Sequence, residues 1–256
     1  MVTIKSEREL ELMEKAGNYV AQVLDELTEK VYPGVSTQDL DFFAEQRCRD
    51  LGVIPAFKGY HGFPGCLCIS VNDEVVHGIP SSKRILNEGD VVGIDFGVIY
   101  QGWFGDSART FPVGKISSEA VQLLDVTKES LHRGIEQCRE GNRLFDIGHA
   151  VQNYVEKFGY SVVREFVGHG IGRALHEDPQ VPNFGAKGKG MELKAGMVLA
   201  IEPMVNAGGP AVQVLEDGWT AVTRDRSLSA HFEHTVAITA DGPRILTPVG
   251  VENASK

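Results

Sequence analysis

Four acidic residues of this sequence stand in apolar surroundings, where a carboxylate is costly unless it is paired or binds a cation. They are Asp95 within VVGIDFG, Asp106 on the strand predicted to follow, Glu202 within AIEPM and Glu233 within HFEHTVAI. His169 stands between glycines in VGHGIG, and such flexible neighbours allow an imidazole to approach a ligand closely. All five side chains are satisfied together if they share metal ions.

The first two acids fall on two predicted strands, residues 91–100 and 106–113, around a glycine-bearing turn. A turn centred near Tyr100 and Gln101 would set Asp95 directly opposite Asp106, with Cβ atoms about 4.5–5.5 Å apart. Carboxylates that close repel each other unless one is protonated or a cation joins them. The alternative, a pair of solvated strand acids, is disfavoured by the apolar sequence around Asp95.

The predicted ligand set is rich in oxygen. Four carboxylates and one imidazole exceed the needs of a structural zinc site, but they suit two adjacent divalent ions of the manganese, iron or cobalt kind. Paired ions of this type promote hydrolysis near neutral pH. Other chemistries find little support, because HExxH, GxSxG and Walker A motifs are absent and Arg173 stands where GxGxxG needs its last glycine.

Four amphipathic helices are predicted to support these strands. Capping-box spacings at Ser6–Glu9 and Ser36–Asp39 open the first two, and the second ends at Gly52. The third begins near Ser117 and the fourth ends at Gly159. Their buried faces are expected to carry Leu10, Met13, Gly17, Val20, Leu24, Leu27 and Val31; then Leu40, Phe43 and Cys48; then Val121, Leu124, Leu131, Ile135 and Cys138; and finally Leu144, Ile147, Val151, Val155 and Phe158.

The sequence repeats itself faintly at an offset of 107 residues. LNEGDVVGID (86–95) matches LKAGMVLAIE (193–202) at five positions, and Gly34, Asp39 and Gly52 have counterparts at the same offset. We therefore predict one domain, residues 1–256, made of two pseudo-symmetric halves, roughly 1–115 and 116–256. Asp95 and Glu202 would then face each other across a pseudo-twofold axis. A chance match among common residues is the alternative.

Composition limits the classes of partner. A formal charge of −10 gives no general attraction to DNA or anionic lipid. The four cysteines form no CxxC pair, and no apolar run approaches the roughly 20 residues that cross a bilayer. The first residues lack the apolar segment of a signal peptide. We expect a soluble cytoplasmic protein with free thiols, in which the Asn-Ala-Ser triplet at Asn253 is a chance match.

These five residues and their settings resemble the pita-bread metallopeptidases, and most of all the type I methionine aminopeptidases. The resemblance covers almost the whole chain. It implies an α+β pita-bread fold with pseudo-twofold symmetry, in which helices back a curved antiparallel sheet. The motifs that carry it are STQDLD (36–41), GYHGFPG (59–65), CISVNDEVVHGIP (68–80), GDSARTF (105–111), VVREFVGHGIGRALHEDPQV (162–181), LKAGMVLAIEPMVNAG (193–208) and DGWTAVTRDRSLSAHFEHT (217–235).

The resemblance also implies roles for individual residues. Asp95 and Asp106 would hold one metal, Asp106 and Glu233 would bridge, and His169 and Glu202 would complete the second site. Glu202 is the implied general base. His77 and His176 would contact the substrate and steady the tetrahedral intermediate. The implied methionine pocket is lined by Tyr60, Phe63, Cys68 and Trp219, which suits a thioether.

The implied reaction is removal of the N-terminal methionine from nascent proteins with a small second residue, through a hydroxide bound to the metals. Two divalent ions are required, and cobalt, manganese, iron and zinc all tolerate this ligand set. The implied partners are nascent chains with a free N-terminal methionine and, transiently, the ribosome, with no DNA or membrane. Nothing in the sequence demands more than a monomer.

Three positions differ from some relatives: Phe63 stands where some have tyrosine, Phe57 where some have cysteine and Leu175 where some have phenylalanine, which leaves the exact pocket shape open. Only 33 residues separate His169 from Glu202, too few for the helical insert of type II enzymes. The alternatives are a proline-specific pita-bread peptidase, which usually carries an additional N-terminal domain, and a catalytically dead binding module. The latter is disfavoured because all five ligands are present and the chain is acidic.

Overall fold

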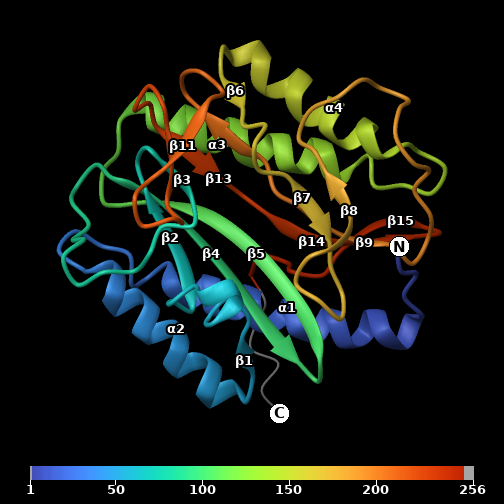
Figure 1. Ribbon diagram of the computed structural model, residues 1–256, viewed down its shortest axis with the longest axis horizontal. Coiled ribbons are helices and arrows are strands. Elements are labelled where there is room, and N and C mark those ends of the chain that lie inside the picture. Colours follow the sequence, from blue (N-terminus) through green and yellow to red (C-terminus); the bar gives the residue numbers. More distant parts are fainter. Residues whose placement is uncertain (1, 251–256) are drawn as a thin grey trace.

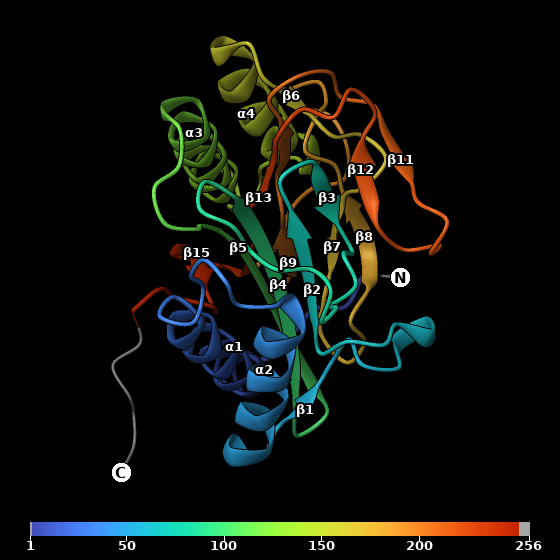
Figure 2. The same ribbon diagram turned by 90° about the vertical axis from the view of Figure 1, so that its left-hand side faces the viewer.

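The computed structural model describes residues 2–250, and Figures 1 and 2 show it from two directions. Asn253 lies outside the described residues. The helices of the described part are α1 (Glu7–Leu27), α2 (Thr37–Leu51), α3 (Ser118–Ile135) and α4 (Leu144–Val155), with short 3-10 turns η1 (Tyr60–Gly62) and η2 (Glu156–Phe158).

The strands of residues 2–250 pair in antiparallel ladders. They are β1 (Ile54–Pro55), β2 (Leu67–Val71), β3 (Glu74–Val76), β4 (Val91–Tyr100), β5 (Trp103–Pro112), β6 (Ser161–Val162), β7 (Gly168–Gly170), β8 (Glu177–Val181), β9 (Val198–Ile201), β10 (Met204–Asn206), β11 (Val212–Val214), β12 (Ala221–Thr223), β13 (Ser229–His231), β14 (His234–Thr239) and β15 (Gly242–Ile245).

The two largest sheets meet at the middle of the molecule. One contains β1, β4, β2 and β5, and the other has the order β15-β14-β9-β7-β8. The long β4–β5 hairpin curves through the centre of Figure 1, and Figure 2 shows the helices on one side of the strands. The predicted α+β pita-bread fold, with helices behind curved antiparallel strands, is confirmed.

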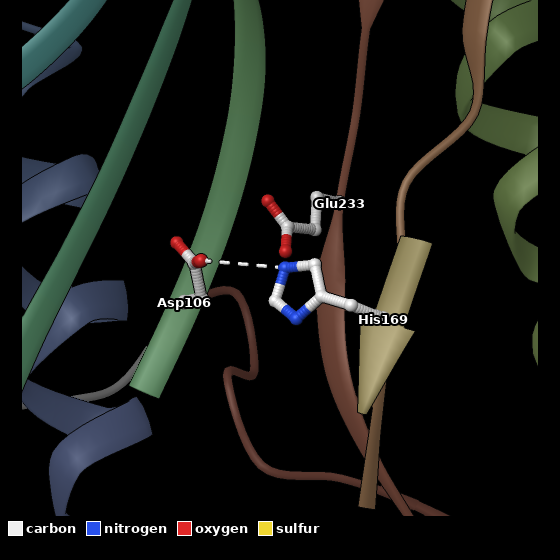
Figure 3. Close-up of side chains that lie close together, drawn as sticks. All are labelled: Asp106, His169 and Glu233. Carbon is white, nitrogen blue, oxygen red and sulfur yellow. Dashed lines mark ion pairs between the residues drawn. The ribbon is translucent and has the colours of Figure 1, made fainter. Parts of the chain in front are cut away.

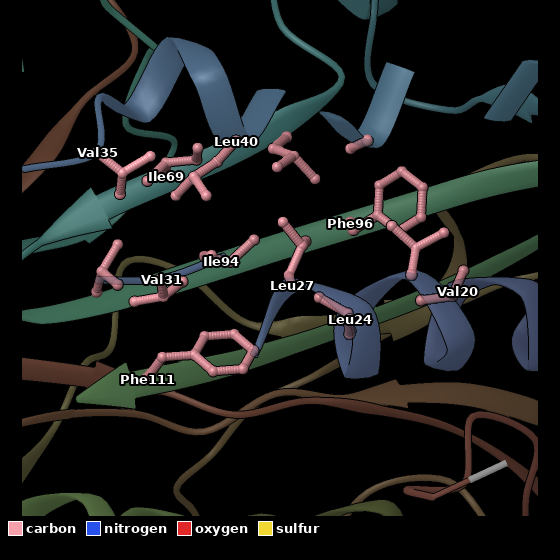
Figure 4. Close-up of a cluster of buried hydrophobic side chains, with 14 of the residues drawn as sticks. Val20, Leu24, Leu27, Val31, Val35, Leu40, Ile69, Ile94, Phe96 and Phe111 are labelled. Atoms are coloured by element: carbon pink, nitrogen blue, oxygen red, sulfur yellow. The ribbon is translucent and has the colours of Figure 1, made fainter. Parts of the chain in front are cut away.

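Helices α1 and α2 pack against the first sheet, and α1 does so through its predicted apolar stripe. Val20, Leu24 and Leu27 of α1 pack with side chains from α2, β2, β4 and β5 (Figure 4). Full burial of each such side chain contributes about 1.5–3 kcal/mol. Gly17 belongs to this stripe because a Cβ there would lie 2.0 Å from the carbonyl oxygen of Leu246.

The β4–β5 register differs from the prediction. Asp95 pairs with Ala108, and Asp106 pairs with Gly97, so the two acids are diagonal neighbours on one face of the hairpin. The turn lies one residue later than expected, at Gln101 and Gly102, whose φ angles are 50° and 78°. Both central residues of this two-residue turn are left-handed, and Gly102 adopts that conformation without strain.

The 107-residue offset is present in the backbone. Ser36 and Arg143 are both helix N-caps, and each forms an isolated β-bridge, to Ile85 and Glu192 respectively. Gly52 and Gly159, also 107 residues apart, both end their helical segments in the left-handed conformation. Corresponding positions of the two halves therefore have the same local structure.

The predicted helix starts are confirmed, but two of the positions predicted to be buried are not. Both capping boxes form, at Ser6 and Ser36, and Ser117 caps α3. Val121 and Phe158, however, are exposed, because the groove between α3 and α4 is left open to solvent there. Among residues 2–250, no helix is both long and apolar enough to span a bilayer.

Candidate metal centre

Strands and strand ends from both parts of the chain supply the five predicted ligands. Asp95 and Asp106 stand on the β4–β5 hairpin of the first half, and His169 stands on β7 of the second. Glu202 directly follows β9, and Glu233 lies between β13 and β14. The two halves are joined beside Asp106, whose N–H donates to Thr235 Oγ1 (3.2 Å) while the same hydroxyl donates to the Asp106 carbonyl (2.7 Å).

The five side chains lie together in the folded protein. Ligand atoms of Asp106, His169 and Glu233 all lie within 4.8 Å of one another (Figure 3). His169 Nε2 is 4.0 Å from Asp106 Oδ2 and 3.5 Å from Glu202 Oε1. Asp95 and Asp106 interact through their carboxyl groups across the hairpin. Gly97 pairs with Asp106, and a Cβ there would lie 3.3 Å from Asp106 Oδ1 and 2.9 Å from Phe57 Cε1.

Burial penalises charge at each of these acids. It raises the pKa of Asp95 to about 7, against the opposing hydrogen bonds from Asp106 and the Phe96 backbone. The pKa of Asp106 lies well above its usual value because of burial and the negative charges of Glu233 and Asp95. Burial and neighbouring acids likewise raise the pKa values of Glu202 and Glu233. Among the described residues, no lysine or arginine lines the cavity that holds these carboxylates.

The unsatisfied atoms of the cluster fit a metal site. Asp95 Oδ1, Asp106 Oδ1 and Glu233 Oε1 are buried without a hydrogen-bond partner among the described residues. Burial, and secondarily the charge of His176, lower the pKa of His169 to about 3, so its imidazole is neutral, the form that binds metals. Oxygen-rich donors with one imidazole suit divalent transition ions.

All eleven predicted site residues line one cavity of about 290 Å³. The acids and His169 form one part of its lining, and aromatic and apolar side chains form another. The complete lining is Phe57, Tyr60, His61, Phe63, Cys68, His77, Asp95, Asp106, His169, Leu175, His176, Glu202, Trp219 and Glu233.

Two predicted substrate-binding histidines face this cavity in defined settings. His176 Nδ1 lies 2.8 Å from the Tyr60 hydroxyl, and its ring centroid is 4.3 Å from that of His169. His77 has a left-handed backbone (φ 62°), a conformation that costs energy outside glycine. The Gly78 N–H that follows donates to Ser70 Oγ, which helps to hold this turn against β2.

Sequence reasoning missed two histidines at the site. His61 lines the cavity beside Tyr60, at a left-handed position (φ 47°) of η1. His231 is buried behind Glu202, with its Nε2 3.8 Å from Glu202 Oε2 and without a hydrogen-bond partner among the described residues. Glu202 is thus flanked by the imidazoles of His169 and His231. Alternation along HFEHT would have placed His231 and Glu233 on one face of a strand, which was the available sign.

Known proteins resemble this chain over nearly its full length. Residues 11–240 match the metallopeptidase family M24. The chain is 53% identical over 247 residues to a methionine aminopeptidase of Clostridium acetobutylicum, covering 96% of this chain and 99% of that one. It is 54% identical over 249 residues to methionine aminopeptidase 1 of Bacillus subtilis, covering 97% and 100%.

Solved structures agree with these sequence matches. The methionine aminopeptidase of Thermotoga maritima superposes with a TM-score of 0.95 at 48% identity, covering 96% of this chain and 99% of that one. A prolidase of Pyrococcus horikoshii gives a TM-score of 0.75 at 26% identity, and the match covers 97% of this chain but 64% of the prolidase. The chain therefore belongs to metallopeptidase family M24, among its methionine aminopeptidases of bacterial type.

Proposed function

We propose that this protein is a metal-dependent aminopeptidase that removes the N-terminal methionine from polypeptides whose second residue is small. The observation that supports this most directly is the cavity itself, which joins a cluster of buried acids to aromatic walls. Phe63 and Trp219 form part of those walls, with ring centroids 5.1 Å apart. Such walls suit a methionine thioether through packing and sulfur–aromatic contact.

Two divalent ions would be held by Asp95, Asp106, His169, Glu202 and Glu233. When bound, such ions activate water for hydrolysis and stabilise the negative charge that develops on the substrate. Their identity is one of cobalt, manganese, iron or zinc. The three unpartnered carboxylate oxygens, and the match to a metallopeptidase family, support this assignment.

The remaining roles belong to the chain's own side chains. Glu202, flanked by two neutral imidazoles, would accept a proton from the attacking water as general base. Burial, and secondarily the charge of His176, lower the pKa of His77 to about 4, so this ring stays neutral and keeps one N–H to donate to the substrate. His176, oriented by Tyr60, would steady the developing oxyanion from a second direction.

We further propose that the substrates are nascent chains at the ribosome, met transiently by a cytoplasmic monomer. The four cysteines are free and buried, which suits a reducing compartment. An acidic chain with a charge of −10 has no electrostatic attraction to DNA or anionic membranes. Residues 1–256 would act as one catalytic domain, because the ligands come from both halves.

The test uses three peptides and metal-loaded protein. Met-Ala-Ser should be cleaved, Met-Lys-Ser should be cleaved far more slowly because little room remains beyond the scissile bond, and formyl-Met-Ala-Ser should be resistant because its blocked amine cannot enter as a free terminus. Mass spectrometry measures all three after equal incubation. Equal release from Met-Lys-Ser would contradict the size limit, and release of formyl-methionine would contradict recognition of the free amine.

Two controls separate the alternatives. Exhaustive chelation should abolish cleavage of Met-Ala-Ser, and a divalent transition metal should restore it. An Ala-Pro peptide should remain intact, whereas a proline-specific peptidase would cleave it. A protein that binds metal but cleaves neither peptide would instead be the catalytically dead binding module.

A further inference from the structure

The residue that follows His176 uses its whole carboxylate to hold the surrounding loop. Glu177 Oε1 accepts the backbone N–H groups of Arg173 (2.7 Å) and Ala174 (3.2 Å). Its Oε2 accepts Lys5 Nζ (2.8 Å) and Thr3 Oγ1 (2.7 Å). One side chain thereby ties residues 3–5 to the loop of residues 172–177.

The cation in this network is buried. The side chains of Lys5 and Glu177 are 4% and 14% exposed, and Lys5 Nζ also donates to Thr3 Oγ1 at 2.6 Å. The Lys5 backbone N–H donates to the Gly196 carbonyl (2.7 Å), which fixes the segment against the second half of the molecule. A Cβ at Gly172 would lie 2.7 Å from Lys5 Cε, so the lysine fills the space against the loop.

This pair differs from an ordinary surface ion pair. Burial opposes ionisation of Glu177, but hydrogen bonds from Lys5 and Thr3 outweigh it and hold the pKa of the carboxyl below its usual value. A buried pair with satisfied hydrogen bonds fixes geometry, and removal of one partner leaves an uncompensated charge. The loop beyond it is also fixed, because the Phe104 N–H donates to the Gly172 carbonyl at 2.9 Å.

The loop held in this way carries residues of the cavity. Leu175 and His176 both line it, and His176 is adjacent in sequence to the anchored Glu177. The His176 ring is positioned on its other side by the Tyr60 hydroxyl at 2.8 Å. A shift of the loop backbone would therefore displace His176 relative to the acid cluster.

We propose that Lys5, acting through Glu177, is a positioning residue that sets the place of His176 in the site. Lys5 itself does not line the cavity. The inference rests on the proposed function for its kinetic consequence, whereas the placement of His176 can be measured without activity. Residues 3–5 thus act on catalysis from outside the pocket.

The experiment combines Lys5→Met with His176→Ala in the full, metal-loaded chain. Methionine keeps the alkyl packing of Lys5 and removes its charge. Because misplacement of a catalytic group costs up to about 100-fold, we expect Lys5→Met to lower kcat for Met-Ala-Ser by roughly 10- to 100-fold at unchanged metal content. In the His176→Ala background the same change should have no further effect.

Two further variants complete the design. Glu7→Gln removes the neighbouring ion pair to Arg244 (2.9 Å), which does not reach the loop, and should leave kcat unchanged. Thr3→Val removes the hydroxyl's two hydrogen bonds, to Glu177 and from Lys5, but leaves Lys5 and Glu177 paired, so it remains informative if Lys5→Met fails to fold. It should lower kcat less than Lys5→Met, and again only where His176 is present.

A readout independent of turnover separates this inference from the proposed function. The NMR signal of the His176 ring should shift in Lys5→Met and Thr3→Val but not in Glu7→Gln. The positioning role would be overturned if Lys5→Met lowered kcat by the same factor in the His176→Ala background as in the wild type. It would also be overturned if neither Lys5→Met nor Thr3→Val shifted the His176 signal. Wild-type protein that leaves Met-Ala-Ser intact while the His176 signal shifts would overturn the proposed function instead.

Discussion

At the scale of single residues, the protonation states in the site depend on where each side chain lies. His169 and His77 are neutral because burial removes the water that would stabilise their charged forms, with His176 adding to the effect. The same burial raises the pKa values of Asp106 and Glu233 and so disfavours their ionised forms. Of the two neutral histidines, His169 lies among the acids and is assigned to the metals, whereas His77 lines the same cavity and is assigned to the substrate.

This division predicts different effects for two histidines. His169→Ala should lower both metal content and kcat, because it removes a direct ligand. His77→Ala should keep the metal content and lower kcat by roughly 10²–10³-fold, the usual cost of a lost oxyanion donor. Metal analysis of the purified variants, with kcat for Met-Ala-Ser, measures both effects. Equal metal loss in the two variants would show that the assigned roles are wrong.

At the scale of elements, the equivalent helices α2 and α4 are capped unequally. The Ser36 hydroxyl accepts the Asp39 N–H (3.1 Å) at the start of α2, whereas Arg143 at the start of α4 has no side-chain oxygen to accept. Arg143→Ser should therefore stabilise the protein by about 1 kcal/mol. The lost ion pair to Glu192, at 3.7 Å and half exposed, is worth little.

Urea unfolding of the metal-loaded protein measures this change in stability. Ser36→Ala is the matched control and should lower stability by a similar amount, because it removes the cap that α4 lacks. An Arg143→Ser variant no more stable than the wild type would mean that the added hydroxyl makes no cap.

Local rules predicted the elements well and their long-range relations less well. Helix starts at Ser6, Ser36 and Ser117 follow from side chains that bond to nearby backbone. The β4–β5 register was misplaced because one turn residue moves every pairing, and Gln101 gave no sign of its left-handed backbone. Roles assigned by resemblance placed all eleven residues in one cavity. His231 had a local sign in the alternation of HFEHT, whereas the Lys5–Glu177 pair joins distant segments that no local pattern relates.

At the scale of the whole molecule, the acid cluster joins the two halves. Burial, and after it negative charges that include Asp95 of the first half, raise the pKa values of Glu202 and Glu233 of the second. Without metal, these charges repel across the contact between β5 and β14. With metal, the same residues should hold the halves together, so metal content and overall stability should be linked.

The pH dependence of the metal-free protein tests this link. The pKa of Asp95 is raised from 3.8 to about 7 by folding, so its contribution to stability is lost as pH rises through that range. Buried histidines act in the opposite direction, and a comparison with Asp95→Asn cancels them. Relative to the wild type, the free energy of unfolding of Asp95→Asn should rise by up to about 1.4 kcal/mol per pH unit between pH 5 and 7.

Thermal unfolding of chelated wild type and Asp95→Asn at pH 5, 6 and 7 measures this difference. Added divalent metal should reverse the order, because the wild type then gains more binding energy than the variant. A difference that stays constant over this pH range would mean that Asp95 is not a source of strain in the metal-free protein.

The shape of the cavity also limits the period during which a substrate can be cleaved. Its acids come from β4, from β5, from the residue after β9 and from the link between β13 and β14, and we expect a polypeptide to reach them end first. With about 290 Å³ of space, the cavity holds one side chain and no folded structure. We therefore expect removal of the N-terminal methionine to compete in time with folding of the substrate. A substrate that buries its first residues early in folding should keep its methionine, even when its second residue is small.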